Sequence, residues 1–262
     1  MLTYLLSRLF RLFMNHVKIG ECEASVGSCD AISREVADEV EALLRSGEEV
    51  VLGLATGSTP LPLYAELLRR HKEEGLSFAK VTSFNLDEYE GIGRDNPRSY
   101  WAEMWENLFS HVDINSEKVH VPPSNFDDAE KAAAEYEALI RDAGGIDWQL
   151  LGIGRDGHVG FNEPGSDGET RTRRVVLADE TREDAAPTFG GLSEVPTHAM
   201  TMGVGTILEA RRVVLIARGS GKKEIVVEAL TGDVGAHVPA SYLRGHQNVG
   251  WFLDHAAAGV EE

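Results

Sequence analysis

Residues 150–163 read LLGIGRDGHVGFNE and carry Asp156, His158 and Glu163 directly after an apolar run. Four glycines are interspersed among these polar residues, at positions 152, 154, 157 and 160. Because glycine lets the backbone turn tightly and approach a ligand closely, the stretch predicts a buried strand that ends in a ligand-facing turn. Two carboxylates and an imidazole at such a strand end are the ingredients of a site that moves protons.

Apolar runs of the same kind, rich in Val, Ile and Leu, predict further buried strands along the chain. With the opening one, they cover residues 50–54, 81–86, 148–153, 213–217 and 249–253. Segments with helical spacing alternate with them, several opening on Pro, Asp or Ser, at residues 30–45, 61–73, 97–109, 127–142 and 222–230. The alternation predicts a three-layer α/β fold, with an open, mainly parallel, Rossmann-like sheet covered by helices on both faces.

The composition narrows the class of partner. The chain has 262 residues, of which 42% are hydrophobic and 26% charged, as in globular proteins. Its formal net charge of −18 argues against a nucleic acid or an anionic membrane as a partner, so an anionic substrate would need a local basic pocket. Cys22 and Cys29 form no CxxC motif, which is typical of a reduced, cytoplasmic setting.

The chain shows no internal repeat and no linker, so we expect one catalytic domain over residues 14–262. Within it, residues 165–191 are rich in Gly and Thr and have weak periodicity, which is typical of a lid. Residues 1–13 are apolar and basic but too short to span a bilayer. We expect them to be a non-catalytic extension, with a targeting segment or a docking helix as the alternative.

Ligands of open parallel sheets bind beyond the carboxyl ends of the strands, where this chain places polar clusters. The first cluster is ATGSTP at residues 55–60, in which Pro60 suits the first turn of a helix. The residues before it offer hydroxyls and a flexible backbone to an anion, typically a phosphate, and are Thr56, Gly57, Ser58 and Thr59. A plain helix cap is the alternative interpretation.

Two more clusters follow predicted strands. In NLDEY, at residues 85–89, Asp87 is the first acid after the buried run and would point into the crevice as a base with an adjusted pKa. Its alternative is a solvated loop with a helix cap. In RGSGKK, at residues 218–223, Lys222 or Lys223 would hold a phosphate together with the first cluster. The alternative there is an exposed, basic helix start.

The opening stretch also allows other interpretations. Residues 152–157 match GxGxxG, but dinucleotide binding needs a helix at the end of that motif, and the glycine and proline that follow disfavour one. A metal site from Asp156, His158 and Glu163 would lack a second histidine at a ligand-like spacing. A glycine-rich turn around a satisfied core histidine is the structural alternative.

Taken together, ATGSTP, FNLDEY, LGIGRDGHVGFNEP, MGVGT and GSGKK closely resemble, in order and spacing, the motifs of glucosamine-6-phosphate deaminases (isomerases). These enzymes form part of the glucosamine/galactosamine-6-phosphate isomerase superfamily, and the resemblance runs from about Met14 to Asp254. The 6-phosphogluconolactonases share the fold and a GxDGH core but lack the FNEP continuation, which stands here at residues 161–164. The resemblance therefore favours the deaminase branch.

The resemblance implies conversion of glucosamine 6-phosphate and water to fructose 6-phosphate and ammonia, with neither a cofactor nor a catalytic metal. It implies that Asp87 moves the proton from C2 to C1, and that His158 opens the sugar ring, oriented by Asp156 and Glu163. The phosphate and neighbouring hydroxyls would be held by Thr56, Gly57, Ser58, Thr59 and Lys222. A lactonase that uses His158 but not Asp87, and a non-catalytic sugar-phosphate sensor, are the alternatives.

The chain departs from the family's pattern in three places. Many members carry a phosphate-binding arginine near residues 187–188, and the candidate replacements here are Arg182, Arg173 and Arg174. Effector-regulated members carry a lysine where this chain has Val175, and they have a longer C-terminal tail. We therefore expect an unregulated enzyme that is a monomer or a small homo-oligomer.

Overall fold

The computed structural model describes residues 14–260. The expected N-terminal extension, residues 1–13, lies outside the described residues. Within residues 14–260, no helix is both long and apolar enough to cross a membrane.

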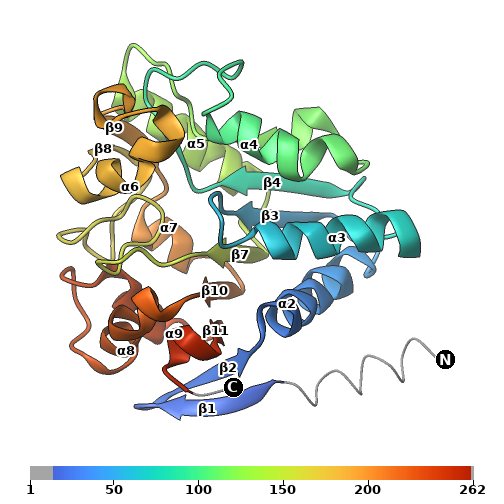
Figure 1. Ribbon diagram of the computed structural model, residues 1–262. Coiled ribbons are helices and arrows are strands. Elements are labelled where there is room, and N and C mark those ends of the chain that lie inside the picture. The colour runs from blue at the N-terminus through green and yellow to red at the C-terminus, as the bar shows by residue number, and fades with distance from the viewer. Residues whose placement is uncertain (1–13, 261–262) are drawn as a thin grey trace.

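An eight-stranded sheet forms the centre of the molecule, in the order β1-β2-β11-β10-β7-β3-β4-β6. Its strands are β1 Asn15–Ile19, β2 Cys22–Gly27, β3 Val50–Leu54, β4 Val81–Asn85, β6 Val119–His120, β7 Trp148–Leu151, β10 Val213–Ala217 and β11 Val249–Asp254. All neighbouring strands pair in parallel except the β1–β2 hairpin. Figure 1 shows most of this order from top to bottom, from β4 to β1, with helices around the sheet. The predicted fold class is confirmed.

The helices in the described residues are α2 Cys29–Leu44, α3 Leu61–Glu74, α4 Tyr100–Asn107, α5 Ala129–Asp142, α6 Asp179–Phe189, α7 Val204–Leu208, α8 Lys223–Thr231 and α9 His255–Ala258. Of these helices, α2, α4, α5 and α9 begin at a side-chain cap, and the other four begin without one. Short 3-10 turns occupy Phe109–His111, Ser116–Lys118, Leu192–Glu194, Ser220–Lys222 and Pro239–Gly245. Ser99 accepts a hydrogen bond from the Ala102 amide, so α4 begins three residues later than predicted. Asp128 caps α5 in the same way.

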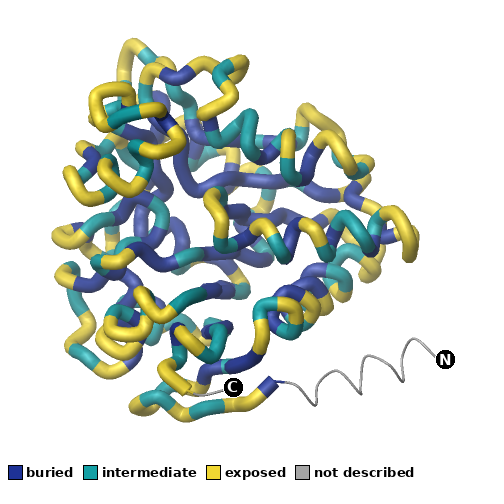
Figure 2. The backbone as a smooth tube through the Cα atoms, viewed as in Figure 1, coloured by how far each residue is buried: buried dark blue, intermediate teal, exposed yellow. Residues whose placement is uncertain are grey.

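The central strands are buried on both faces, which is why they read as continuous apolar runs. Every residue of β3 and β10 is buried, whereas the edge strand β1 is largely exposed (Figure 2). Gly53 has no room for a side chain, because a Cβ there would overlap the side chain of Gln149 on the neighbouring strand β7. This close packing holds β3 beside β7, and each of these strands is followed by one of the polar clusters.

A second, three-stranded antiparallel sheet lies at the upper left of Figure 1 beside α6. It consists of β5 Asp87–Tyr89, β9 His198–Thr201 and β8 Arg173–Val176, in that order. The predicted strand 81–86 ends in the structure at Asn85, and the chain passes through Leu86 directly into the small sheet. The small sheet is not predicted by the sequence analysis, because three or four residues are too few to show an alternating pattern.

The segment expected to be a lid, residues 165–191, contains regular structure. It includes β8 and the eleven-residue helix α6. The sequence analysis predicts no helix there, because α6 contains Pro187 and buries only Phe189 among its residues. Phe189 packs in a hydrophobic cluster with Tyr89 and Phe161, so α6 is joined to the small sheet.

Candidate active site

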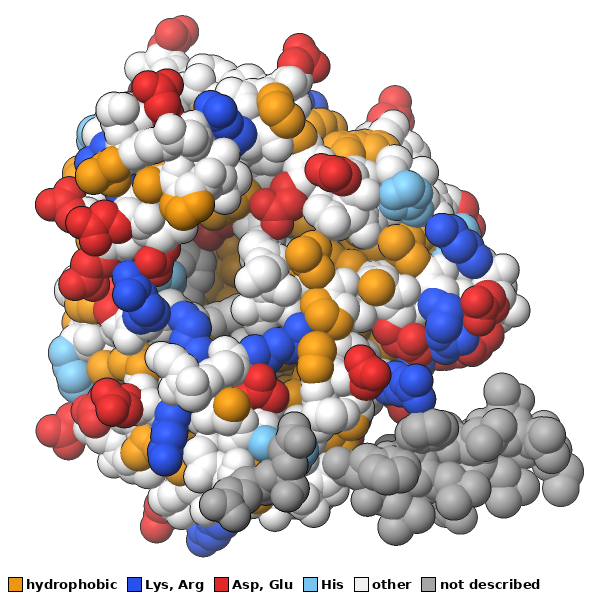
Figure 3. Space-filling model, in the orientation of Figure 1, with side chains coloured by type: hydrophobic (Ala, Val, Ile, Leu, Met, Phe, Trp, Pro, Cys, Tyr) orange, Lys and Arg blue, Asp and Glu red, His pale blue; other side chains and the backbone are white. Residues whose placement is uncertain are grey.

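A cavity of about 520 Å³ opens beyond the carboxyl ends of β3, β4 and β7, where an open parallel sheet binds its ligands. It is lined by seven of the nine predicted site residues: Thr56, Gly57, Ser58, Thr59, Asp87, His158 and Lys222. Asp156 and Glu163 are not among its lining residues. Figure 3 shows a hollow on this face, with hydrophobic side chains in its depth and Lys or Arg side chains along its lower edge. The structure thus brings the predicted acid–base and anion-binding groups to one place.

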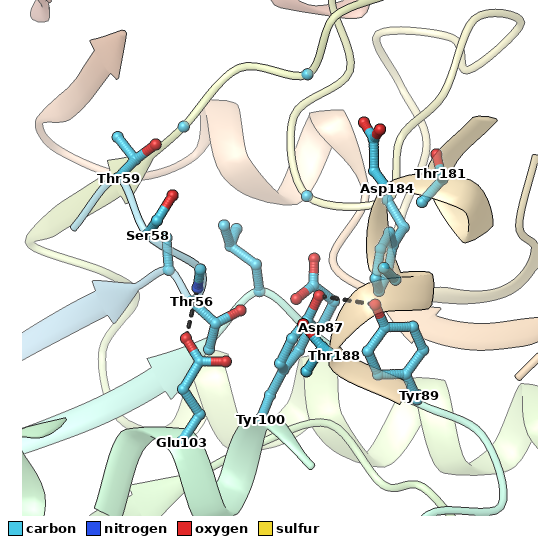
Figure 4. A pocket seen from close by; sticks show the side chains of 18 of the residues that line it. Thr56, Ser58, Thr59, Asp87, Tyr89, Tyr100, Glu103, Thr181, Asp184 and Thr188 are labelled. Carbon is cyan, nitrogen blue, oxygen red and sulfur yellow. Dashed lines mark hydrogen bonds between the residues drawn. The ribbon is translucent and has the colours of Figure 1, made fainter. Parts of the chain in front are cut away.

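The β3–α3 turn, residues 56–59, forms one wall of this cavity (Figure 4). Gly57 has a φ of 87°, a backbone conformation that favours glycine. The Tyr64 hydroxyl donates a 2.5 Å hydrogen bond to the Ala55 carbonyl and holds the strand end. No side chain caps α3, so the hydroxyls of the turn are not used for the plain helix cap that was the alternative interpretation.

Asp87 lies in the middle of the cavity, at the start of β5 (Figure 4). The side chain is buried, with the residue 6% exposed, and within the described part of the chain its carboxylate has no hydrogen bond or ion pair. Burial, together with the charges of Glu88 and Glu103, raises the pKa of Asp87 well above its ordinary value. Asp87 is therefore not part of a solvated loop, and it is a carboxylate poised to accept a proton.

His158 faces the cavity from the turn that follows β7. Its Nδ1 lies 2.7 Å from Oδ1 of Asp156, and the same oxygen accepts a 3.1 Å hydrogen bond from the backbone amide of His158. Burial raises the pKa of Asp156, but the hydrogen-bonding and charge interactions with His158 outweigh it and hold that pKa below its ordinary value. Gly154 lies against the imidazole so closely that a Cβ there would overlap the ring. Asp156 therefore contacts the imidazole from outside the cavity, and its role in orienting His158 stays a prediction.

Glu163 does not contact His158 in this structure. Its carboxylate accepts hydrogen bonds from the amide of Ala178, at 2.9 and 3.0 Å, and from the hydroxyl of Thr181, at 2.6 Å. These contacts place Glu163 at the N-terminal end of α6, where a negative charge is favourable. An effect of Glu163 on His158 stays a prediction.

The residues around the GxGxxG match contain no helix. After β7, the described chain forms turns and an isolated bridge between Val159 and Asn162, and its next regular element is β8. The motif thus lacks the helix N-terminus on which a dinucleotide would be held.

Lys222 is the predicted cation that the structure places at the cavity. Burial lowers the pKa of Lys222, while the charge of Asp184 raises it and that of Arg155 lowers it further. Arg155 donates to both carboxylate oxygens of Asp184, at 2.7 and 3.1 Å, and so joins the His158 turn to α6. Asp184 itself lines the cavity opposite the β3–α3 turn (Figure 4).

The three candidate replacements for the family's arginine all point elsewhere. Arg182 donates to the carbonyls of Leu192 and Val195. Arg173 binds the side chains of Asn162 and Ser166, and Arg174 pairs with Glu90. None of the three lines the cavity, so this prediction is wrong for the described structure. The arginine that does line it is Arg98, over the ring of Phe189.

Two acids of this region were not predicted. The carboxylate of Glu88 accepts hydrogen bonds from the amides of Tyr89, Tyr100 and Trp101 and ties the start of α4 to β5. Burial raises the pKa of Glu88 to about 6, although these three amides lower it. Glu103, on α4, lines the cavity and binds the Gly57 amide. Two consecutive acids after a buried strand are a signal for Glu88, but Glu103 lies in an ordinary amphipathic helix.

Comparison with known proteins gives one consistent family. Residues 25–251 match the family model described as glucosamine-6-phosphate isomerases/6-phosphogluconolactonase. A glucosamine-6-phosphate deaminase of Rhodopirellula baltica is 46% identical over 231 residues, which are 88% of this chain and 92% of that protein. One from an Arthrobacter species is 47% identical over 222 residues, 85% of each chain.

The solved structures agree with this result. A monomeric glucosamine-6-phosphate deaminase superposes with a TM-score of 0.87 at 40% identity, covering 89% of this chain and 97% of that one. A 6-phosphogluconolactonase of Thermotoga maritima gives a TM-score of 0.69 at 25% identity, covering 86% and 94%. Both similarities cover nearly the whole described chain.

Proposed function

The chain belongs to the family of glucosamine-6-phosphate isomerases and 6-phosphogluconolactonases, and we propose that it is a glucosamine-6-phosphate deaminase. The proposed reaction converts glucosamine 6-phosphate and water to fructose 6-phosphate and ammonia. The observation that carries the proposal is the presence of Asp87 and His158 in one cavity with the β3–α3 turn. The relatives that cover most of the chain and bear this activity support it.

The proposed mechanism begins with the substrate's phosphate held by the β3–α3 turn and Lys222, which fixes the sugar in the cavity. His158 then moves the proton that opens the pyranose ring, because the nitrogens of an imidazole can both donate and accept a proton. Asp156 holds the ring of His158 in place.

Asp87 then takes the proton from C2 of the open-chain sugar and returns it to C1, while one proton passes from the ammonium group to the C1 oxygen. The C1 aldehyde thereby becomes an alcohol, and an iminium group is left at C2. Water adds to that carbon, and ammonia leaves as the carbonyl of fructose 6-phosphate forms. A single carboxylate can serve both adjacent carbons only where bulk water is excluded, and the burial of Asp87 supports this role.

The experiment that tests this function measures ammonia release from glucosamine 6-phosphate and hydrolysis of 6-phosphogluconolactone by the same preparation. We expect ammonia release and no lactone hydrolysis. Hydrolysis of the lactone without ammonia release would show that the chain acts as a lactonase instead. Binding of the amino-sugar phosphate without turnover would show a sensor.

We also propose that the enzyme works in the cytoplasm as a monomer or a small homo-oligomer. Both cysteines, Cys22 and Cys29, are free thiols, which suits a reducing compartment. The solved relative described as monomeric supports the small assembly.

The rate of the reaction will depend on the ionisation of Asp87. Only the carboxylate form accepts a proton, and burial raises the pKa of Asp87 well above its ordinary value. We therefore expect kcat/KM to fall on acidification at a pH well above the value of about 4 at which an exposed aspartate titrates. A pH profile of kcat/KM measures this. A profile that stays flat down to that value would contradict the role of Asp87 as the base.

Replacement of Lys222 by methionine will weaken substrate binding. Loss of a charge-assisted contact to phosphate is expected to raise KM about tenfold or more, with a smaller change in kcat. The matched control is Lys223→Met, because Lys223 is the exposed neighbour that packs on Gly259 and does not line the cavity. Steady-state kinetics on both variants tests the assignment, and equal effects would contradict it.

A further inference from the structure

Glu103 joins α4 to the β3–α3 turn across the floor of the cavity. Its Oε1 accepts a 2.6 Å hydrogen bond from the amide of Gly57. Figure 4 shows the side chain pointing from α4 toward the turn, below Thr56 and Ser58. A carboxylate therefore already accepts a hydrogen bond from one amide of the turn, and this turn is proposed to bind the phosphate.

That amide matters because the helix start that follows the turn adds few backbone donors to it. Pro60 and Pro62, at the start of α3, have no N–H, so the helix offers fewer donors than an ordinary N-terminus. Among the described contacts of residues 56–59, the Gly57 amide is the backbone donor with a partner. Gly57 and Ser58 are exposed to the cavity, so a ligand can reach this turn.

The negative charges around Glu103 disfavour the binding of a second anion, such as a phosphate, at the adjacent turn. Asp87, Glu106 and Asp184 also line the cavity, against the cations Lys222 and Arg98. Burial, and the charge of Glu106, raise the pKa of Glu103, while the Gly57 amide lowers it. A phosphate placed on the turn would share a donor with, and be repelled by, the Glu103 carboxylate.

We propose that Glu103 is an internal anion that occupies the Gly57 amide in the free protein and that the phosphate of the ligand displaces. This proposal depends on the proposed function only in taking the ligand to be a sugar phosphate. Glu103 then weakens the binding of inorganic phosphate, which has no further contacts to offset the displacement. A sugar phosphate also contacts the rest of the cavity and is selected over the free anion.

The test compares Glu103→Gln with Glu106→Gln. Both substitutions remove one negative charge from the cavity wall on α4, but Glu106 is exposed and its side chain makes no hydrogen bond to the turn. We expect Glu103→Gln to bind inorganic phosphate about tenfold more tightly by titration calorimetry, the size of one charge–charge contact. Glu106→Gln is expected to change the affinity by less than about twofold, since its charge is screened by solvent.

Two results would overturn the proposal. If Glu103 only braces the turn, Glu103→Gln will bind phosphate more weakly than the wild type. If only the net charge of the cavity matters, the two variants will change alike. Thermal denaturation of each variant checks that the fold is retained.

A second measurement does not depend on any variant. In a crystal of the wild-type protein soaked with inorganic phosphate, we expect phosphate on the turn and the Glu103 carboxylate withdrawn from Gly57. A bound phosphate with the Gly57–Glu103 hydrogen bond intact would reject the displacement. Because phosphate binding is measured directly, a protein that failed to release ammonia would contradict only the proposed function.

Discussion

Replacing Asp87 with asparagine will lower kcat for ammonia release by about a thousandfold or more. The amide cannot accept the C2 proton, and general base catalysis of this kind contributes on the order of 10²–10⁴ to a rate. The side chains are nearly equal in size, so the buried site keeps its packing, and loss of a buried, unpaired carboxylate relieves an unfavourable charge. We therefore expect the variant to remain folded and to bind substrate.

The matched control for this variant is Asp184→Asn. Asp184 also lines the cavity, but it lies on α6 in an ion pair with Arg155 and away from the strand end that carries Asp87. We expect its kcat to change by no more than a few-fold. Full activity in Asp87→Asn, measured as ammonia release with substrate saturating, would reject the proposed base.

Replacing His158 with glutamine will lower kcat/KM on glucosamine 6-phosphate by about a hundredfold or more, because ring opening loses its acid–base group. A second reaction distinguishes the effect of His158→Gln from that of Asp87→Asn. Exchange of the C1 protons of fructose 6-phosphate with solvent, in the presence of ammonia, reports on Asp87 alone. We expect this exchange to persist in His158→Gln and to vanish in Asp87→Asn, followed by NMR in deuterated water.

An exposed histidine serves as the control for this substitution. His111→Gln changes a residue beyond the end of α4 that does not line the cavity. It is expected to leave kcat/KM unchanged. Loss of C1 exchange in His158→Gln to the same extent as in Asp87→Asn would show that His158 takes part in the proton transfer between C2 and C1, and not in ring opening.

The main sheet was predictable because its parallel strands are buried on both faces. Val50–Leu54 and Val213–Ala217 read as uninterrupted apolar runs, and their bounds in the structure agree with the prediction. The small sheet and α6 were not predictable in this way. Their strands are short, and α6 carries few apolar residues and an internal proline, so tertiary contacts and not local pattern decide their structure.

The candidate site shows the same division. Asp87, His158 and the residues of the β3–α3 turn follow buried strands, so topology brings them together. Glu103 reaches the cavity from an amphipathic helix and Asp184 from a helix with few apolar residues, and neither sequence marks these acids as site residues. Glu163 is five residues from His158 in the chain, yet its contacts are to α6, because separation in sequence does not define side-chain direction in a turn.

Leu86 separates the two sheets, and Asp87 is the first residue beyond it. By its pairing with Thr201, Asp87, the proposed base, belongs to the small sheet, whereas His158 follows a strand of the large one. The two groups proposed to react therefore come from different sheets, so their relative position depends on how these two sheets pack against each other. Substitutions in the small sheet are therefore expected to be limited by the need to keep Asp87 in position relative to His158. This limit applies even to residues that do not contact the sugar.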